Sequence, residues 1–289
     1  MRTVYGKVIK VIPHNRIIKV LTSEKLVSLY MSRKLFKDFG PYFAYSPYVF
    51  VNVTDEKKYT NGVNAIEIDS FVKIVRPTKA KGRKDVYYDI QMIKKGVWNL
   101  LEHQSYKMFI DLEFTLPSYF QTAQHISEIV QYGIVIEDKD GKVVFEKGEL
   151  VKPKKPYGLN QRTLKFLSKK YSDFNDACSY ADFYNLLIEL IDKYDPKVIA
   201  WGKSDMIAME QSFTYNKLPK IDIRNRYLNL MQVIKNYYNY KNDLGLFSTY
   251  QELLGLELDE QAHDALEDAM VAREIYNIFK KNVQKDLEK

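Results

Sequence analysis

Residues 107–114 read KMFIDLEF and place Asp111 and Glu113 two positions apart in an otherwise apolar run. In a β-strand, side chains at positions i and i+2 lie on the same face. A strand here therefore turns its apolar side chains into a core and leaves the two carboxylates side by side on the other face. Adjacent carboxylates repel each other, more strongly when buried, unless a cation lies between them. The pair is a candidate metal site; a polar strand face in water is the alternative interpretation.

Two later segments contribute groups of the same kind. KVIAWGKSD (197–205) reads as a buried strand followed by a helix with Asp205 in its first turn, where functional groups of α/β sheets are common. An aspartate there can equally balance the helix dipole. HDALEDA (263–269) opens the last predicted helix. On one continuous helix His263 and Asp268 would lie about 140° apart. Their convergence thus requires His263 in the preceding loop and Asp268 in the opening turns of the helix.

The surroundings of these motifs predict an α/β fold with a mixed sheet. Three successive strands are expected at 107–114, 130–138 and 142–151, with a turn at Asp140-Gly141. Further along the chain we expect helices at 181–194, 204–215 and 263–281, a strand at 197–202 and a strand-to-helix segment at 221–238. Ser204 is the expected N-cap of the second helix, and Asp264 and Glu267 suit the N-terminus of the third without needing a catalytic role.

The N-terminal segment 1–76 is β-rich and predicts a small β-barrel-like domain of the OB or cold-shock type. The expected elements are strands at 3–12, 16–22, 26–31, 48–53 and 65–75 and a short helix within 32–43. Residues 76–84 are dense in Lys and Arg and read as a solvated linker, and 86–104 has helical apolar spacing. The expected organisation is a domain at 1–76, a basic linker and lead-in helix at 77–105, a second domain at 106–282 and a charged tail at 283–289.

Charge is distributed unevenly along the 289 residues. Residues 1–100 hold 19 Lys/Arg and 8 Asp/Glu, whereas residues 101–289 hold 25 and 29. The basic front half predicts a surface for nucleic acid, with a solvated basic surface that has no partner as the alternative. Aromatic residues in the same half can stack bases or form the core of the small domain. They are Phe36, Phe39, Tyr42, Phe43, Tyr45, Tyr48 and Phe50.

Several classes of protein are disfavoured by the sequence. No apolar run approaches the roughly 18 to 20 residues needed to cross a bilayer, so no membrane partner is expected. The N-terminus alternates apolar and basic residues, unlike a secretory signal. The single Cys178 cannot form an internal disulfide. The sequence therefore predicts a cytoplasmic protein.

The ordered set of D-x-E, a later Asp within WGKSD, and H-x4-D resembles the DEDDh family of 3′-5′ exonucleases, which includes the proofreading subunit of polymerase III. EIVQYGIVIEDKDG (128–141) and GLFSTYQELLGLELDEQAHDALEDA (245–269) are similar to the sequence surrounding the family's motifs. The resemblance covers residues 106–282. Residues 160–177 depart from it, because they match the expected substrate-contacting loop only loosely.

The resemblance implies a ribonuclease H-like fold and a site with two Mg²⁺ or Mn²⁺ ions. Asp111, Glu113 and Asp268 would bind the first ion, Asp111 would also bind the second, which Asp205 would hold through water, and His263 would be the general base. The implied reaction is hydrolysis of single-stranded DNA or RNA from the 3′ end to nucleoside 5′-monophosphates. A catalytically silent nucleic-acid-binding protein and a polymerase-associated interaction subunit are the alternatives.

Overall fold

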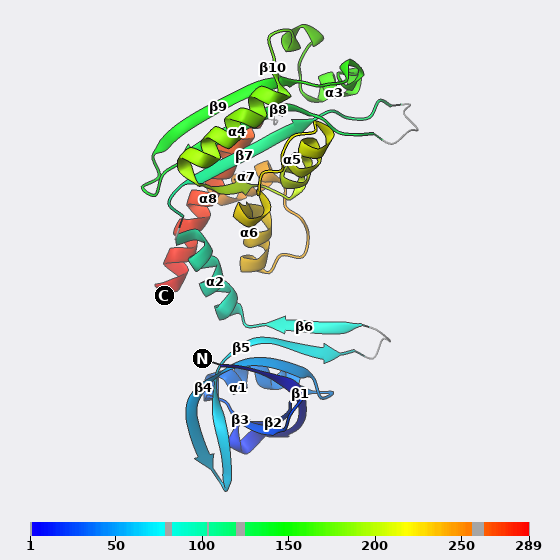
Figure 1. Ribbon diagram of the computed structural model, residues 1–289. Coiled ribbons are helices and arrows are strands. Elements are labelled where there is room, and N and C mark those ends of the chain that lie inside the picture. Colours follow the sequence, from blue (N-terminus) through cyan, green and yellow to red (C-terminus); the bar gives the residue numbers. More distant parts are fainter. Residues whose placement is uncertain (1, 79–82, 103, 120–124, 256–262, 289) are drawn as a thin grey trace. The chain divides into compact units, whose positions relative to one another are not determined.

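The computed structural model describes residues 2–78, 83–102, 104–119, 125–255 and 263–288 (Figure 1). The chain forms two compact units, Met1–Gly96 and Val97–Lys289. The boundary falls within helix α2 (Ile90–Glu102), whose Val97 and Leu101 are buried. Each unit is described by itself. Among the helices of the described residues, none is long and apolar enough to cross a membrane.

The first unit contains a closed five-stranded barrel. Its strands are β1 (Arg2–Ile12), β2 (Ile17–Leu21), β3 (Leu26–Tyr30), β4 (Tyr48–Thr60) and β5 (Val63–Pro77). The sheet order is β3-β2-β1-β4-β5, and a parallel pairing of β3 with β5 at Leu29 and Ile66 closes it. Helix α1 (Arg33–Phe39) lies between β3 and β4 in sequence and begins at Ser32, whose hydroxyl accepts from the Leu35 N–H at 3.2 Å. The small barrel predicted from the sequence is confirmed.

The aromatic residues of segment 36–50 divide between core and surface. Phe39 and Phe43 are buried and both rings pack against Phe71 inside the barrel, whereas Tyr45 and Tyr48 are exposed. The barrel core also holds the inward-facing valines and isoleucines of β1, β2, β4 and β5. The structure thus supports the core interpretation for part of this set and leaves a surface role open only to the exposed rings.

The segment 77–105 differs in part from the expected linker. Strand β6 (Lys84–Tyr88) pairs with the end of β5, and Arg76 bonds its cross-strand partner Asp85 at 2.7 Å. The polar stretch 54–62 is also more ordered than its composition indicated. There β4 and β5 continue to a tight turn at Asn61 and Gly62, both with positive φ as a two-residue hairpin turn requires.

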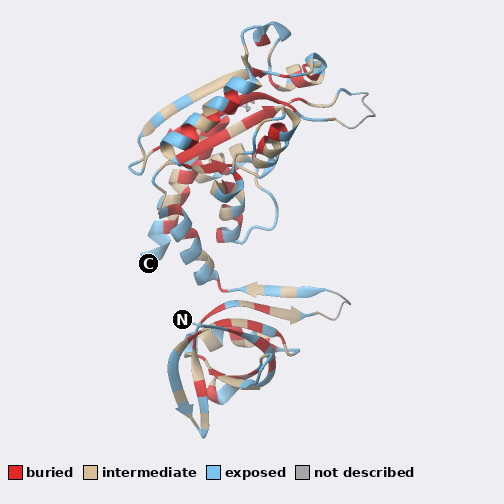
Figure 2. Cartoon of the chain, viewed as in Figure 1, coloured by how far each residue is buried: buried red, intermediate tan, exposed pale blue. Residues whose placement is uncertain are grey.

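The second unit is built on a mixed six-stranded sheet with the order β10-β9-β8-β7-β11-β12. The antiparallel strands β7 (Lys107–Phe114), β8 (Ile129–Glu137) and β9 (Val143–Lys152) correspond to the three predicted in succession. The remaining strands, β10 (Cys178–Ser179), β11 (Lys197–Ala200) and β12 (Tyr227–Asn229), pair in parallel. The predicted α/β fold with a mixed sheet is confirmed. Every residue of β8 is buried, as Figure 2 shows for the centre of this sheet.

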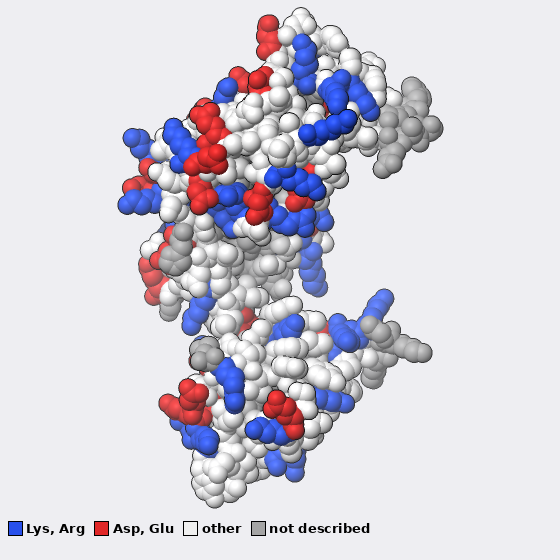
Figure 3. Space-filling model, in the orientation of Figure 1, with Lys and Arg blue, Asp and Glu red and all other residues white. Residues whose placement is uncertain are grey.

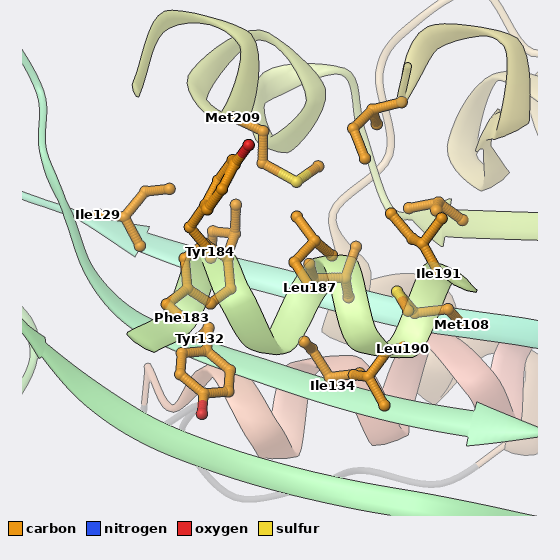
Figure 4. Close-up of a cluster of buried hydrophobic side chains, with 14 of the residues drawn as sticks. Met108, Ile129, Tyr132, Ile134, Phe183, Tyr184, Leu187, Leu190, Ile191 and Met209 are labelled. Carbon is orange, nitrogen blue, oxygen red and sulfur yellow. The ribbon is translucent and has the colours of Figure 1, made fainter. Parts of the chain in front are cut away.

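Helices cover both faces of this sheet. On one face α4 (Tyr180–Tyr194) and α5 (Ser204–Tyr215) bury alternate residues of β7 and β8, such as Ile110 and Ile134, against Phe183 and Leu187 (Figure 4). On the other face lies α8 (Ala265–Leu287), against which α6 (Leu230–Tyr238) and α7 (Leu246–Leu254) pack (Figure 1). Because residues alternate along β7, the side chains between those of the first core point toward α8.

Two details of the helices differ from prediction. Ser204 is the first residue of α5 instead of its N-cap; Lys203 occupies the cap position and makes no side-chain cap bond. Helix α8 continues to Leu287 and buries Val283 completely, so most of the segment expected as a charged tail is helical. The buried Val283 explains the extension, because it continues the apolar face of the helix.

Candidate active site

Strand β7 presents Asp111 and Glu113 to the face covered by α8. Their intervening neighbour Leu112 is buried in the opposite core, as the alternation predicted. Across the ladder, Asp111 lies opposite Gly133 and Glu113 opposite Gln131 on β8. Glu113 is only 7% exposed, so one of the two carboxylates is held almost entirely away from bulk water.

Two glycines let the start of α8 lie directly against the sheet. Gly133 and Gly148 are cross-strand partners on β8 and β9. A Cβ added to Gly133 would lie 2.0 Å from the carbonyl oxygen of Ala265, and one added to Gly148 would lie 2.7 Å from Cβ of Leu266. Contact of backbone with backbone at this distance is possible only without a side chain. The first turn of α8 is thereby held over β8, beside Asp111 and Glu113.

The entry to α8 places His263 and Asp268 as their spacing required. Asp264 is the N-cap, and its carboxylate accepts from the N–H groups of Leu266 and Glu267 at 3.1 and 3.3 Å. His263 precedes the helix and Asp268 lies one turn inside it. One ligand atom from each of Glu113, His263 and Asp268 lies within 4.8 Å of the others.

Asp205 reaches the same region from α5. It is 6% exposed, and its Oδ1 accepts a hydrogen bond of 3.2 Å from the backbone N–H of Leu112. Since Leu112 lies between Asp111 and Glu113, this bond ties Asp205 to the strand that holds the acidic pair. Burial raises the pKa of Asp205 to about 6, and its bonds to backbone N–H groups oppose that shift.

The electrostatics of the cluster show four carboxylates sharing one small volume. Burial raises the pKa of Asp111 well above its ordinary value, and repulsion from Asp205, Asp268 and Glu113 adds to the effect. Burial, followed by repulsion from Asp268 and Asp205, raises the pKa of Glu113 to about 8. Neighbouring negative charges of this kind are stabilised by protons or by cations. The structure therefore brings together all five residues singled out from the sequence.

The donor atoms fit a hard divalent cation. Four carboxylates offer oxygen ligands, which Mg²⁺ and Mn²⁺ prefer, and the single cysteine of the chain, Cys178, lies on β10 outside the cluster. The raised carboxylate pKa values indicate that the cluster is costly without a compensating positive charge. The residues present thus fit the metal centre that the resemblance implied.

Sequence reasoning missed the residues that support His263. The ring of Phe166 stacks on the imidazole with centroids 4.1 Å apart and planes at 23°. Phe166 ends helix α3 (Gln161–Phe166), within the segment that departs from the family pattern. Nearby, Gln131 donates to Asp264 at 2.7 Å, and Lys169 Nζ lies 4.0 Å from the same carboxylate. No periodicity or spacing in the sequence indicates these contacts.

The segment between β9 and α4 is anchored to the sheet at several points. Buried Glu128 accepts from the N–H groups of Lys154 and Lys155 at 2.7 and 3.2 Å. Asn160 caps α3 and donates to the carbonyl of Leu116 at 2.7 Å. Hydrogen bonds therefore hold this segment in place beside the site, although its sequence matched the expected loop only loosely.

The mixed sheet with helices on both faces defines a ribonuclease H-like fold. The sequence matches no family profile. It is 28% identical over 178 residues to the probable 3′-5′ exonuclease KapD of Bacillus subtilis (strain 168), covering 61% of this chain and 85% of that protein.

Solved structures show the same fold. The nuclease domain of 3′hExo, a DEDDh family member solved with rAMP, has a TM-score of 0.54 and 16% identity, covering 63% of this chain and 94% of that one. Cell-death related nuclease 4 (CRN-4) has a TM-score of 0.52 and 16% identity, covering 63% of this chain and 64% of that one. The resemblance to DEDDh 3′-5′ exonucleases predicted from the sequence is confirmed.

Proposed function

We propose that this chain is a metal-dependent 3′-5′ exonuclease that releases nucleoside 5′-monophosphates. The observation that carries the proposal is the convergence of Asp111, Glu113, Asp205 and Asp268 with His263 at one end of an exonuclease fold. The similarity to KapD, a probable 3′-5′ exonuclease, supports the activity. Independent elements supply the five groups, so their meeting is a property of the fold and not of one local motif.

The carboxylates would hold the divalent ions. Asp111, Glu113 and Asp268 would bind one ion, and Asp111 would also bind a second, which Asp205 would hold through water, as the resemblance implied. When bound, such ions activate water and stabilise negative charge on a phosphodiester. The carboxylates would set where such ions lie relative to the end of β7. Mg²⁺ and Mn²⁺ both suit this all-oxygen set.

His263 is proposed as the general base. Its side chain is 39% exposed and its Nδ1 lies 4.0 Å from Glu113 Oε1, so the ring borders the cluster while remaining open to water. An imidazole at the rim can accept a proton from the attacking water and pass it to solvent. The 3′hExo domain was solved with rAMP, a nucleoside monophosphate of the kind proposed as product here.

The proposed substrate is single-stranded nucleic acid with a free 3′ end, either DNA or RNA. One structurally similar 3′-exonuclease recognises the 3′ end of a histone mRNA stem-loop. The first unit, with its excess of Lys and Arg, is proposed as an auxiliary nucleic-acid-binding barrel, and its strand order and the helix between β3 and β4 support the OB type. A cytoplasmic location stays a prediction from the sequence.

A time course on matched 5′-labelled single-stranded DNA and RNA with Mg²⁺ tests the activity. We expect a ladder that shortens from the 3′ end, with the rate showing which sugar is preferred. Asp111→Asn should abolish cleavage, whereas Glu146→Gln, which changes an exposed carboxylate on β9, should leave it intact. If neither substrate is cut and both are still bound, the chain is the catalytically silent binding protein instead.

A further inference from the structure

The outer face of the barrel carries an organised set of aromatic and basic side chains. Across the antiparallel strands β1, β4 and β5, Tyr5 lies opposite Phe50, and Phe50 lies opposite Lys73. In the adjoining row Lys7 lies opposite Tyr48. Directly opposed residues in a sheet share one face. We call these five residues the aromatic face.

This face points away from the barrel core. The residues that alternate with it on β1 and β4, including Val4, Val49 and Val51, are all buried in the core of the first unit. Tyr5 is 57% exposed and Tyr48 is 49% exposed. Large aromatic side chains therefore lie on the outer surface, although the core is filled by side chains from the other face of the same strands.

The rings are arranged for stacking. Tyr5 and Phe50 lie nearly parallel, with centroids 5.8 Å apart and planes at 14°. Lys73 Nζ lies 4.6 Å from the centroid of the Phe50 ring. Phe50 is thus held between a ring and a cation, and it fixes the orientation of the more exposed Tyr5. A ring whose orientation is already restricted in this way loses little conformational entropy when a planar ligand stacks on it.

Charge on and around the face favours a polyanion. Lys7 and Lys73 belong to it, and no Asp or Glu does. Of the unit's acidic side chains, Asp38, Glu67, Asp69 and Asp89 border a cavity of about 680 Å³, and Glu24 lies near Tyr5 together with Arg2 and Lys25. Figure 3 shows Lys and Arg side chains near the end of β5 and the start of β6 in the same unit. Aromatic faces combined with lysines are the features with which proteins bind single strands without reading sequence.

We propose that the aromatic face binds single-stranded nucleic acid, with bases stacked on Tyr5 and Tyr48 and phosphates near Lys7 and Lys73. A single strand is the expected ligand because a duplex hides the base faces on which aromatic side chains stack. The consequence for catalysis rests on the proposed exonuclease activity. A strand held by the first unit raises the effective concentration of its 3′ end at the site on the same chain.

Binding is tested on the full chain carrying Asp111→Asn, so that the probe is not cut. Fluorescence anisotropy with 5′-labelled (dT)20 and (rU)20 compares Tyr5→Ala/Tyr48→Ala with Tyr59→Ala. Tyr59 is a matched control, because it lies on the same strand β4, is 73% exposed and is outside the face. We expect the double variant to bind about tenfold more weakly or worse, and the control to bind normally. Equal affinity in all three proteins would overturn the proposal.

Two further variants separate stacking from folding and from charge. Tyr5→Leu/Tyr48→Leu keeps apolar strand side chains but removes the rings, so it should weaken binding while the thermal melt stays unchanged. Lys7→Glu/Lys73→Glu should make the slope of log affinity against log salt concentration shallower, by about 0.7 for each phosphate that is no longer neutralised. Lys57→Glu, at an exposed position of β4 near Tyr59, should not. Normal affinity and salt dependence in both face variants would contradict the proposal.

The catalytically intact chain distinguishes this inference from the proposed function. The double tyrosine variant should cleave a dinucleotide at the normal rate but show a KM about tenfold higher for the 20-mer. If nothing is cleaved, the exonuclease proposal fails, while the anisotropy comparison still tests the face.

Leu21 and Leu26 are also exposed on this barrel. If the tyrosine variants change the mass measured by light scattering and not the affinity for (dT)20, the face binds a second copy of the chain and the proposal is wrong.

Discussion

His263 is positioned by two contacts of different kinds. Phe166 stacks on its ring, and the Glu113 carboxylate lies 4.0 Å from Nδ1. The stack restricts rotation of a ring that is otherwise open to solvent, and the proposed role as general base requires such a fixed orientation toward the attacking water. We expect His263→Ala to lower kcat by about 10². Phe166→Leu should lower kcat by a smaller factor and leave KM for a dinucleotide unchanged.

The split between kcat and KM checks the role of Phe166. Phe166→Tyr keeps a ring at the same place and should restore most of the rate that Phe166→Leu removes. A rise in KM with normal kcat would show instead that Phe166 contacts the substrate.

Asp264 and Glu267 have different structural roles, which their positions in the sequence did not indicate. Asp264 caps α8 and accepts from Gln131, whereas Glu267 is exposed in the first turn. Asp264→Ala should lower the free energy of unfolding by about 1 kcal/mol through loss of the cap. Asp264→Asn, which keeps a capping oxygen, should lower it less, and Glu267→Ala should change it by about 0.5 kcal/mol or less. Urea denaturation of the three variants measures the difference; equal midpoints would show that the cap contributes nothing.

The five candidate site residues could be singled out from the sequence because their ordered motifs resemble those of the DEDDh family. Strand alternation put Asp111 and Glu113 on one face, and helix geometry put His263 outside α8. Phe166 could not be predicted, because its contact depends on how the irregular segment before α4 folds back. That segment is fixed by the bond from the Lys154 N–H to Glu128 and by the bond from Asn160 to the Leu116 carbonyl, which no periodicity reveals.

At the scale of elements, the contact between α8 and the sheet decides whether the site forms. Gly133→Ala would place a Cβ 2.0 Å from the Ala265 carbonyl oxygen and push the first turn of α8 away from β8. We expect this variant to lose about 1–3 kcal/mol of unfolding free energy through overpacking. Cleavage should fall by at least about tenfold, because Asp268 moves with the helix.

Gly96→Ala provides the comparison for that variant. A Cβ at Gly96 in α2 meets nothing within 4 Å, and alanine favours helix, so this change should leave stability and activity intact or slightly improved. Denaturation and the cleavage assay are run on both proteins. Normal cleavage by Gly133→Ala would show that the position of α8 tolerates the shift.

Strands and helices could be predicted from the sequence where burial imposes a regular spacing of apolar residues, as in β7, β8 and α4. For the hairpin between β4 and β5, the sequence indicates the turn at Asn61-Gly62 but not the extension of β4 through residues 54–60, because these residues are mostly polar and none is buried. Its register is set by the Asn61-Gly62 turn and not by a hydrophobic pattern. Strand β6 was divided between the predicted linker, which ended at Lys84, and the predicted helical segment 86–104, because five residues paired at one edge of the sheet give no periodic signal of their own.

For the molecule as a whole, the sequence located two units but not which aromatic residues each would bury. Phe39 and Tyr48 belong to the same aromatic stretch, and only closure of the barrel sends one inward and the other outward. The direction of a side chain at the end of a short helix or the start of a strand depends on how the strands meet. Local spacing does not determine it.

The carboxylate cluster should couple the stability of the protein to pH. Glu113 has an ordinary pKa of 4.5 that is raised to about 8, and the pKa of Asp205 is raised from 3.8 to about 6. The folded, metal-free protein therefore keeps protons that the unfolded chain has released between about pH 4 and 8, so its unfolding free energy falls as pH rises through that window. Divalent cations favour the ionised carboxylates, and their stabilising effect should grow over the same range.

Thermal melts at pH 5.5 and pH 8, in EDTA and in Mg²⁺, measure this coupling. In EDTA the Tm should be several degrees lower at pH 8, since about 1 kcal/mol shifts the Tm of a domain of this size by about 2–4 °C. Mg²⁺ should raise the Tm more at pH 8 than at pH 5.5. Glu113→Gln removes the carboxyl group whose pKa rises to about 8 and should flatten both differences. Titration of other groups changes wild type and variant alike, so an equal pH response in the two proteins would show that the carboxylate cluster is not the source.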